Sequence, residues 1–454
     1  MKKNMLSLMV LLPFAAFAET VEISGVYYNL DDANGTAEVT SNPKKYTGYV
    51  DIPRHISYKG NSFYMVTSIG EDAFNGCDQL SHVDIPNSIE SIGRCAFKGC
   101  RNIMSISIPE SIDSIGTYAF DGCGFQHVSI NDLEAWCNIK FDSYKSNPVS
   151  SSRRVYLNGE DILDLELPEG LTEIKDFTFC NFTYLKSISI SSSVTKIGRC
   201  AFKDSKFLQD INISDDIEYV GTGALDNTAW LESQQDGVVY AGMHAYGYKG
   251  KMPIGTNIEI KEGTKSVVGS AFYEFTELSS IIFPNSLEVI GDYSFSHCFN
   301  LTDIVIPSGV YKVGSGAFYD CSSLSFVEIG NGVKTICDYA FGWCPNLTTV
   351  RCLAEIVPDA NADTFDDSFE KAILYVPASA ISKYKSTEPW NKFKKILTLD
   401  GEEGDEETNI KALVQDEHDN LLRYYSVDGK PIDKIRKGIN IICVDKKSIK
   451  VVTK

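Results

Sequence analysis

One stretch of the chain decides its fold: Ile85-Pro86-Asn87-Ser88-Ile89-Glu90-Ser91-Ile92-Gly93-Arg94-Cys95-Ala96-Phe97-Lys98-Gly99-Cys100-Arg101-Asn102-Ile103-Met104-Ser105-Ile106-Ser107-Ile108-Pro109. Its phenylalanine belongs to a series of positions that recur at intervals of 23 residues. A fixed period in the range of about 20 to 50 residues is typical of solenoids, in which each repeat buries its apolar face only against its neighbours. The series comprises Phe74, Phe97 and Phe120, then Phe179 and Phe202, then Phe272, Phe295, Phe318 and Phe341.

The same stretch predicts the local structure of one repeat. Ile103, Ile106 and Ile108 are spaced as in a strand with one buried face, because the last two alternate with polar residues. Pro109 ends this strand, since proline has no N–H to donate to a ladder. Gly93 marks a turn that needs either a positive φ or the close approach of another backbone segment. We therefore expect a mainly β repeat solenoid with parallel strands and coils of about 23 residues.

Two intervals in the series are longer than one repeat. Phe120 precedes Phe179 by 59 residues, and Leu225, which takes one phenylalanine position, precedes Phe272 by 47 residues. Extra chain in repeat proteins maps to one face and often builds the binding surface. The two insertions are expected near residues 131–160 and 226–256, the second with a hairpin at 237–248.

The two ends of the chain predict further parts around the solenoid. A basic start, a short apolar run and the small residues Ala16 and Ala18 form the pattern of a secretory signal peptide, and the run is too short for a membrane anchor. Acidic residues predict a linker before a last segment with strand-like runs. The expected parts are a signal peptide at 1–18, an N-terminal β cap at 19–57, the solenoid at 58–377, a C-terminal cap at 378–399, the acidic linker at 400–409 and a small β module at 410–454.

The charge of the chain narrows the class of partner. It has 42 Lys and Arg against 61 Asp and Glu, and a formal net charge of −19. An acidic surface repels phosphate backbones, so we expect no nucleic-acid partner. Acidity also favours a soluble monomer. For an exported chain without a transmembrane anchor, the expected partner is an extracellular protein or glycan.

Thirteen cysteines in an exported chain raise the question of disulfides. Six of them lie three residues after a repeat phenylalanine, where other repeats hold Phe, Ser or Thr. Such a position is a packing position, in which a free thiol acts as a small hydrophobe. The chain has no Cys-x-x-Cys pair and its six His are dispersed, so we expect no metal site and no cofactor. The six are Cys77, Cys100, Cys123, Cys298, Cys321 and Cys344.

The sequence contains none of the common catalytic motifs that we looked for. There is no Gly-x-Ser-x-Gly elbow, no His-Glu-x-x-His pair and no phosphate-binding glycine loop. Ser105 lies between His82 and His127 in one outward strand column, but the column continues with the ordinary polar residues of a solvated sheet face. We therefore expect no enzymatic activity and no catalytic residue.

Aromatic residues outside the phenylalanine series are the candidates for contacting a partner, because Tyr and Trp supply rigid amphipathic contact area. The alternative is that they fill gaps left by degenerate repeats, and for Trp136 and Trp230 this alternative is favoured. Trp343 takes a turn position that holds glycine in other repeats, so its ring is expected on the surface. The candidate partner-binding residues are Tyr144, Tyr240, His244, Tyr246, Tyr248 and Trp343.

The unit Ile-Pro-x-Ser-Ile-x-x-Ile-Gly-x-x-Ala-Phe-x-x-Cys resembles the BspA-type leucine-rich repeat family of bacterial surface proteins, over nearly all of residues 20–399. The resemblance implies a right-handed leucine-rich-repeat solenoid at the cell surface. The best-known members are described as adhesins for host matrix proteins such as fibronectin and fibrinogen. The end of the chain, Tyr425 to Lys454, resembles the C-terminal sorting domains of type IX secretion, which usually carry Tyr or Phe where this chain has Asn440.

Three classes of function follow from these patterns. The first is a secreted or cell-surface binding protein, adhesin-like, that recognises a host or matrix protein or a glycan through its solenoid face and aromatic insertions. The alternative is a structural spacer on the bacterial surface without a ligand of its own. An enzyme acting on glycans would need paired carboxylates facing one cleft, and the sequence offers only scattered acids such as Asp303 and Glu328.

Overall fold

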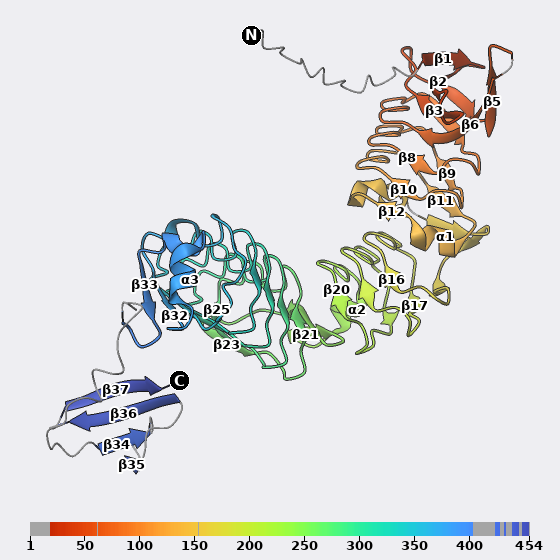
Figure 1. Ribbon diagram of the computed structural model, residues 1–454. Coiled ribbons are helices and arrows are strands. Elements are labelled where there is room, and N and C mark those ends of the chain that lie inside the picture. Colours follow the sequence, from red (N-terminus) through yellow and green to blue (C-terminus); the bar gives the residue numbers. More distant parts are fainter. Residues whose placement is uncertain are drawn as a thin grey trace, which may run out of the picture. The chain divides into compact units, whose positions relative to one another are not determined.

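The computed structural model describes residues 19–60, 62–152, 154–402, 423–426, 431–432, 438–444 and 447–453 (Figure 1). The expected signal peptide and most of the expected acidic linker lie outside the described residues. The chain divides into two compact units. The N-terminal unit runs to Lys251 and includes Val268–Ala271, and the C-terminal unit holds Met252–Val267 and the chain from Phe272 onward.

The N-terminal unit begins with antiparallel strands and continues as stacked parallel ones. The antiparallel strands are β1 (Glu19–Ile23), β2 (Val26–Asp31) and β3 (Thr36–Thr40), with β5 (His55–Tyr58) paired to β6 (Ser62–Ile69). One parallel ladder comprises β6, β8 (Ser91–Ile92), β10 (Ser114–Ile115) and β12 (Lys140–Phe141). The longer strands form two further sheets. In one, β4 (Gly48–Asp51) pairs with β7 (Leu80–Asp84). In the other, β9 (Ser105–Ile108), β11 (His127–Ile130) and β13 (Arg154–Leu157) lie side by side, and β14 (Glu160–Asp161) pairs with β13 at the edge.

The rest of this unit repeats the same pattern and carries both insertions. It has two further parallel ladders. One comprises β15 (Asp164–Glu166), β17 (Ser187–Ser189) and β19 (Asp210–Ile211), and the other comprises β16 (Glu173–Ile174), β18 (Lys196–Ile197) and β20 (Tyr219–Val220). The first insertion contains α1 (Leu133–Asn138) and two 3₁₀ turns, η1 (Tyr144–Ser146) and η2 (Pro148–Ser151). The second contains α2 (Ala229–Ser233) and the hairpin of β21 (Gly237–Ala241) and β22 (His244–Lys249).

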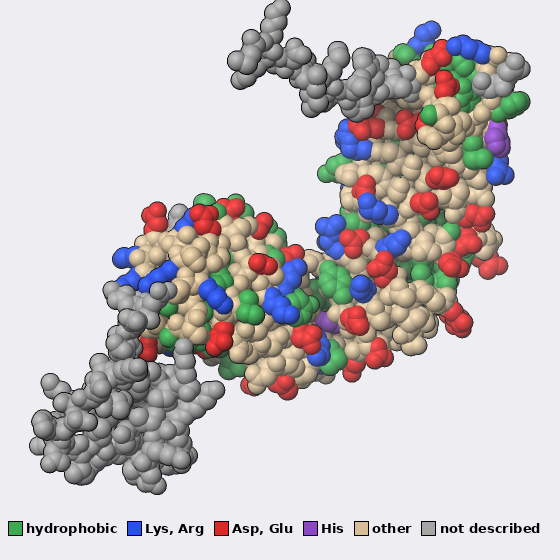
Figure 2. Space-filling model, viewed as in Figure 1, with side chains coloured by type: hydrophobic (Ala, Val, Ile, Leu, Met, Phe, Trp, Pro, Cys, Tyr) green, Lys and Arg blue, Asp and Glu red, His purple; other side chains and the backbone are tan. Residues whose placement is uncertain are grey.

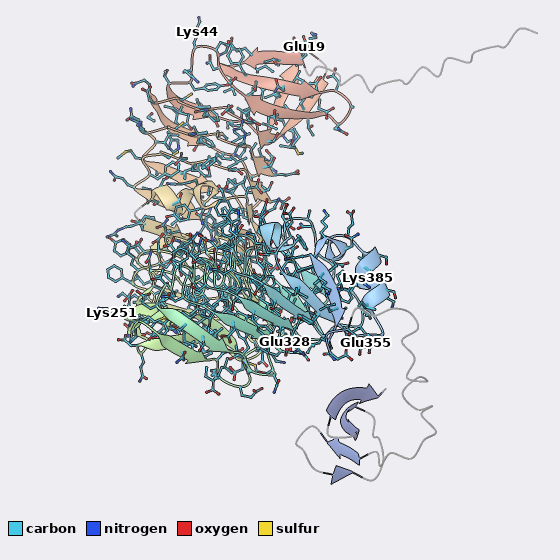
Figure 3. The ribbon with its side chains drawn as sticks, turned by 90° about the vertical axis from the view of Figure 1, so that its left-hand side faces the viewer. Glu19, Lys44, Lys251, Glu328, Glu355 and Lys385 are labelled. Atoms are coloured by element: carbon cyan, nitrogen blue, oxygen red, sulfur yellow. The ribbon has the colours of Figure 1, made fainter. Side chains whose placement is uncertain are left out.

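The C-terminal unit is built from the same coils. Its parallel ladders are β24 (Ser266–Val267), β26 (Val289–Ile290), β28 (Lys312–Val313) and β30 (Thr335–Ile336); β23 (Thr256–Glu259) with β25 (Leu278–Ile282); and β27 (Asp303–Ile306), β29 (Phe326–Ile329), β31 (Thr349–Cys352), β32 (Ile373–Val376) and β33 (Lys395–Thr398). Three short helices lie between the last strands of this unit: η3 (Asp366–Ser368) precedes β32, and α3 (Ile381–Ser386), which carries Lys385 (Figure 3), and η4 (Trp390–Lys392) lie between β32 and β33. An antiparallel sheet comprises β34 (Arg423–Ser426), β35 (Pro431–Ile432), β36 (Gly438–Val444) and β37 (Lys447–Thr453).

The strand register confirms the expected mainly β solenoid with parallel strands and coils of about 23 residues. Ile304 on β27 lies opposite Val327 on β29, which lies opposite Val350 on β31. All three side chains are buried, and their neighbours on the same strands face outward, as the alternation of apolar and polar residues predicts.

The repeat phenylalanines form stacks of rings through the centre of each unit. In the C-terminal unit the ring centroids of Phe295 and Phe318, and of Phe318 and Phe341, are 5.3 Å apart, with interplanar angles of 6° and 4°. In the N-terminal unit the stack begins with Tyr46, whose ring is 4.8 Å from that of Phe74. Offset stacking of this kind adds to the burial of each ring, so every coil is stabilised by its neighbours.

Gly93 and Gly116 belong to a column of glycines, one in each of several coils, that we call the glycine column. These glycines allow close backbone approach and do not serve a positive φ. A Cβ atom on Gly116 would lie 2.6 Å from the backbone N of Arg94 and 2.8 Å from the backbone C of Gly93. Positive φ angles occur at other points of the turn, for example 76° at Gly99, two residues after a repeat phenylalanine. The glycine column therefore sets how closely consecutive coils stack.

The cysteine position after each repeat phenylalanine is explained by a hydrogen bond. The Sγ–H groups of Cys298 and Cys321 donate to the carbonyl oxygens of Phe272 and Phe295 in the preceding coil, each at 3.2 Å. Ser205 makes the same bond to the Phe179 carbonyl oxygen at 2.7 Å. A Cys or Ser at this position therefore bonds to the preceding coil, whereas Phe182 and Phe275 fill it by packing. The twelve cysteines whose side chains the structure describes are free thiols.

We expect the substitution Phe318→Ala to lower the free energy of unfolding by about 3–5 kcal/mol, because it leaves a cavity in the ring stack. The matched control is Tyr311→Ala, whose exposed ring should cost less than about 0.5 kcal/mol. Urea unfolding followed by circular dichroism measures both. Equal costs for the two variants would contradict the role of the stack.

Stability should fall at alkaline pH because burial raises the pKa of the Cys100, Cys298 and Cys344 thiols to about 12. An unfolded thiol has a pKa of about 8.5. The contribution of each buried thiol is therefore complete below about pH 8.5 and is lost progressively as the pH rises toward the folded value.

Each of these thiols should remove about 1.4 kcal/mol of stability per pH unit in that window. The control is the triple Cys→Ser variant at these positions, which keeps a donor as Ser205 does and has no thiol to ionise. Urea midpoints measured from pH 8 to 10.5 should fall less steeply for this variant. Identical slopes would contradict the prediction.

Candidate functional site: an aromatic ridge on the repeat turns

The turns around the repeat phenylalanines carry exposed aromatic side chains in the C-terminal unit. Each turn offers outward positions two residues before the phenylalanine and one, two and four residues after it. In successive coils of this unit these positions hold rings that continue from coil to coil. We define the aromatic ridge as Tyr273, Tyr293, His297, Phe299, Tyr319, Tyr339 and Trp343.

Ring contacts connect six members of the ridge into one surface. His297 is the centre of the first part, and Tyr319 is the centre of the second. The centroid distances are 5.3 Å for Tyr273–His297, 5.9 Å for His297–Phe299, 5.8 Å for His297–Tyr319, 6.3 Å for Tyr319–Tyr339 and 6.2 Å for Tyr319–Trp343. All lie within the range in which aromatic pairs attract each other, so the rings hold one another in place.

Two glycines give these rings room to lie against the coil. A Cβ atom on Gly316 would lie 2.4 Å from Cε1 of Tyr293, so this tyrosine ring occupies the space that a side chain would fill. A Cβ atom on Gly342 would lie 3.2 Å from Cδ1 of Tyr339 and 3.3 Å from Cδ2 of Tyr319. The rings of the ridge thus rest on backbone.

Trp343 is the most exposed ring of the ridge, with 61% of its surface accessible. Its φ is +55°, in a turn position that holds Gly76, Gly99 and Gly122 in the N-terminal unit. A bulky residue with positive φ is uncommon and costs free energy that a glycine or asparagine would avoid. Glu274 and His297 have the same positive φ at this position in other coils, so the exposure of the Trp343 ring, and not its φ, marks it as a candidate contact residue.

Carboxylates border the ridge. Asp320 lies 3.7 Å from Nε2 of His297. Burial, and then the charges of Asp320 and Asp366, raise the pKa of Tyr319. The charge of Asp363, followed by burial, raises the pKa of Tyr339. The ridge therefore combines apolar ring faces with hydrogen-bond acceptors at its edge.

The same turn positions in the N-terminal unit show that the repeat does not require aromatic rings there. They hold residues such as Lys98, Lys203 and Asp226, and Figure 2 shows acidic and basic side chains interspersed along this unit. Lys203 pairs with Asp226 at 3.7 Å, and the Lys98 ammonium lies 5.5 Å from the ring centroid of Tyr118. Tyr118 and Phe177 do occupy the position two residues before the phenylalanine in this unit, but the connected ring contacts that define the ridge belong to the C-terminal unit.

The expectation that the hairpin presents His244 and Tyr246 to a partner is wrong, because both side chains are buried. The Tyr246 hydroxyl donates to Oδ1 of Asp226 at 2.8 Å and accepts from the backbone N–H of Leu225 at 2.8 Å. Nε2 of His244 hydrogen-bonds to the Ile217 carbonyl oxygen at 2.8 Å. These two residues join the hairpin to the preceding coil.

The other candidate residues lie at different places. Tyr240 and Tyr248 are half-buried on the hairpin, and a role for them in binding stays a prediction. Tyr144 is half-buried, and its hydroxyl lies between the amide of Asn181 and the carboxylate of Asp204. Only Trp343 of the six candidates belongs to the ridge.

The ridge was missed by reasoning from the sequence, which looked for binding residues in the insertions. A signal was available in the turn columns. Tyr273 and Tyr319 each follow a repeat phenylalanine directly, and Tyr293 and Tyr339 each precede one by two residues. In the N-terminal unit the column directly after the phenylalanine holds no aromatic residue, whereas the column two residues before it includes Tyr118 and Phe177, so only the first column distinguishes the two units.

The two acids considered for an enzyme, Glu328 and Asp303, each interact with a neighbouring side chain. Glu328, labelled in Figure 3, lies on β29, and its Oε2 is 3.2 Å from Nε of Arg351. Oδ1 of Asp303 accepts a hydrogen bond from the Thr302 hydroxyl at 2.8 Å. Among the described residues, no group of three or more His, Cys, Asp or Glu side chains is placed to hold a metal ion.

The two histidines beside Ser105 have partners of their own. The His82 ring stacks on Tyr49 with a centroid distance of 5.4 Å, and its Nε2 is 2.9 Å from Oδ1 of Asp84. His127 meets Tyr156 edge-on at 5.4 Å.

In the described part of the chain, no helix is long and apolar enough to cross a membrane.

Comparison with known protein families finds one matching model, that of the BspA type leucine rich repeat region. It matches residues 67–155, 150–235 and 244–369, which together make up more than half of the chain. A search of the curated proteins returned no match.

Comparison with solved structures matches several chains. A leucine rich cell surface protein from Faecalibacterium prausnitzii is 18% identical, with 74% of this chain and 94% of that chain covered and a TM-score of 0.33. A leucine-rich repeat protein from Bacteroides ovatus is 22% identical, with 73% and 94% covered and a TM-score of 0.25. The pneumococcal vaccine antigen PcpA is 16% identical, with 82% and 96% covered and a TM-score of 0.37.

The buried position of Tyr246 leads to a prediction about stability. Tyr246→Phe removes the hydroxyl that joins Asp226 to the Leu225 N–H, so the free energy of unfolding should fall by about 1–3 kcal/mol. Tyr293→Phe, at an exposed ring, is the matched control and should change it by less than about 0.5 kcal/mol. Urea unfolding of both variants gives the comparison. An unchanged free energy of unfolding for Tyr246→Phe would contradict the structural role of this hydroxyl.

Proposed function

The chain belongs to the BspA-type leucine-rich repeat family, and from this membership we propose that it is a secreted or cell-surface protein that binds an extracellular ligand through its aromatic ridge. The role is that of an adhesin-like binding protein without enzymatic activity. The ligand is an extracellular protein or glycan, and the protein acts as a monomer.

The observation that carries the proposal is the concentration of exposed rings on the turns of the C-terminal unit. Exposed aromatic surface is unfavourable in water, and contiguous exposed patches mark interaction sites. Tyr and Trp are also the residues enriched among those that dominate binding energy. Because the N-terminal unit folds with Lys98, Lys203 and Asp226 directly after the repeat position, folding does not account for Tyr273 and Tyr319 at the same place in the C-terminal unit.

A structural spacer is the second candidate, and one observation favours it. Ion pairs join side chains on adjacent coils, such as Arg199 with Asp176 at 3.6 Å and Arg351 with Glu328 at 3.2 Å. Charged pairs along an array can stiffen it, although each exposed pair contributes little by itself. In this alternative the ridge would have no ligand.

The route to the cell surface is part of the same proposal. The resemblance of the N-terminal residues 1–18 to a signal peptide, and of the segment from Tyr425 to Lys454 to a type IX sorting domain, supports export and surface attachment. Strands β34, β36 and β37 fit a small terminal β module. An export assay with and without residues 410–454 tests the attachment.

The ligand-binding proposal is tested with the triple variant Tyr293→Ala, Tyr339→Ala and Trp343→Ala. Binding of the purified protein is measured against immobilised extracellular matrix proteins and a glycan array. We expect the triple variant to lose at least about tenfold in affinity for the ligand found, because it removes the exposed ring surface.

The control is Phe207→Ala, which removes an equally exposed ring from the N-terminal unit and should leave binding unchanged. Circular dichroism and the urea midpoint verify that both variants are folded. Binding that survives the triple substitution would place the ligand elsewhere on the protein. A folded protein that binds nothing in the screen would favour the spacer.

A further inference from the structure

We propose that the ridge binds a neutral, extended polysaccharide of β-1,4-linked hexopyranose units, which lies along the solenoid with its sugar rings on the aromatic faces. This inference rests on the proposed binding function and specifies the chemical class of its ligand. Three features of the ridge carry it: the exposure of its rings, their period, and the acids at the edge.

The tyrosine rings of the ridge rest beside backbone and still reach the solvent. Tyr293 lies beside Gly316, and Tyr339 and Tyr319 lie beside Gly342. Tyr293 and Tyr339 are nevertheless 47% and 42% exposed. Because the rings of Tyr319 and Tyr339 are nearly perpendicular, at 86°, a sugar chain would stack on one tyrosine column at a time. An aromatic face is electron-rich and attracts positively polarised hydrogens. The axial C–H groups of a β-linked hexopyranose form such a surface on the flat side of each sugar.

The period of the ridge fits a linear polymer. Adjacent coils are 5.3 Å apart at the phenylalanine stack, so ridge positions two coils apart are separated by about 10–11 Å. Tyr293 and Tyr339 are such a pair, with Gly316 between them. Tyr273 and Tyr319 are another. The separation is close to the disaccharide repeat of an extended β-1,4-linked chain, in which alternate sugars turn the same face to one side.

The acids at the edge of the ridge select against charged polymers and against a protein interface. Asp320, Asp363 and Asp366 repel carboxylated or sulfated glycans. A protein partner would have to bury these charges, and the cores of protein interfaces are depleted of charged residues. A neutral sugar chain leaves them hydrated, and its hydroxyl groups can donate hydrogen bonds to them.

Trp343 supplies a direct readout, because its ring is 61% exposed whereas Trp136 and Trp390 are buried. The purified full chain is titrated with cellohexaose, chitohexaose and mannohexaose while tryptophan fluorescence is recorded. We expect a saturable change with at least one of the three. Trp343→Phe should remove most of the signal and keep binding, as measured by affinity electrophoresis in a gel that contains β-1,4-glucan or β-1,4-mannan.

The paired variant Tyr293→Ala and Tyr339→Ala should weaken binding by at least about tenfold, whereas Phe207→Ala should not change it. Tyr339→Phe should retain binding, because it keeps the ring face. Maltohexaose, an α-linked and curved chain of the same sugar as cellohexaose, and polygalacturonate, an anionic chain, should not bind.

Four outcomes overturn the inference: no binding of any β-1,4-linked hexaose, equal binding of maltohexaose, preferred binding of the anionic chain, or binding unaffected by the paired variant. The proposed function fails separately from the inference. If a protein ligand is lost on the ridge substitutions and no glycan binds, the ridge is the binding surface and the ligand class is wrong. If binding of every ligand persists in the ridge variants, the proposed surface is also wrong.

Discussion

Stacking of each repeat phenylalanine on the next is the contact on which the rest of the structure depends. One coil of about 23 residues cannot bury its own apolar face, so its stability comes from its neighbours. The glycine column holds consecutive backbones close enough for rings such as Phe318 and Phe341 to meet at 5.3 Å. In several coils a cysteine or serine three residues after the ring, such as Cys344 or Ser205, donates to the coil before it. With the centre of each coil fixed in this way, the outward turn positions are free to vary.

The two units use that freedom differently. The N-terminal unit places ion pairs such as Lys203 and Asp226 at its turns, which leaves a hydrated surface. The C-terminal unit places tyrosines, a histidine and Trp343 at the equivalent positions, and glycines at 316 and 342 give the rings space. Because the coil is the same in both, the fold by itself does not require the connected rings of the C-terminal unit.

Much of the fold could be predicted from the sequence, since the spacing of Phe97 and its equivalents and the alternation around Ile106 reflect local rules that recur in every coil. The hairpin could not. Its register shifts between Val239 and Tyr240, and the sequence does not reveal which face of such a hairpin turns toward the preceding coil. Tyr246 was therefore expected as a possible contact residue and lies buried on Asp226. The ridge escaped notice for a related reason: exposure of Tyr293 depends on a glycine in the next coil, 23 residues away in sequence.

The central claim is that the aromatic ridge is the surface that touches the ligand. Hydroxyl-radical footprinting of the protein, with and without saturating bound ligand, measures this for each aromatic side chain. The account predicts protection of Tyr293, Tyr339 and Trp343 and unchanged reactivity of Phe207 in the N-terminal unit. Full reactivity of the ridge in the complex, with protection confined to the sheet face around Tyr375 or to the hairpin, would contradict it.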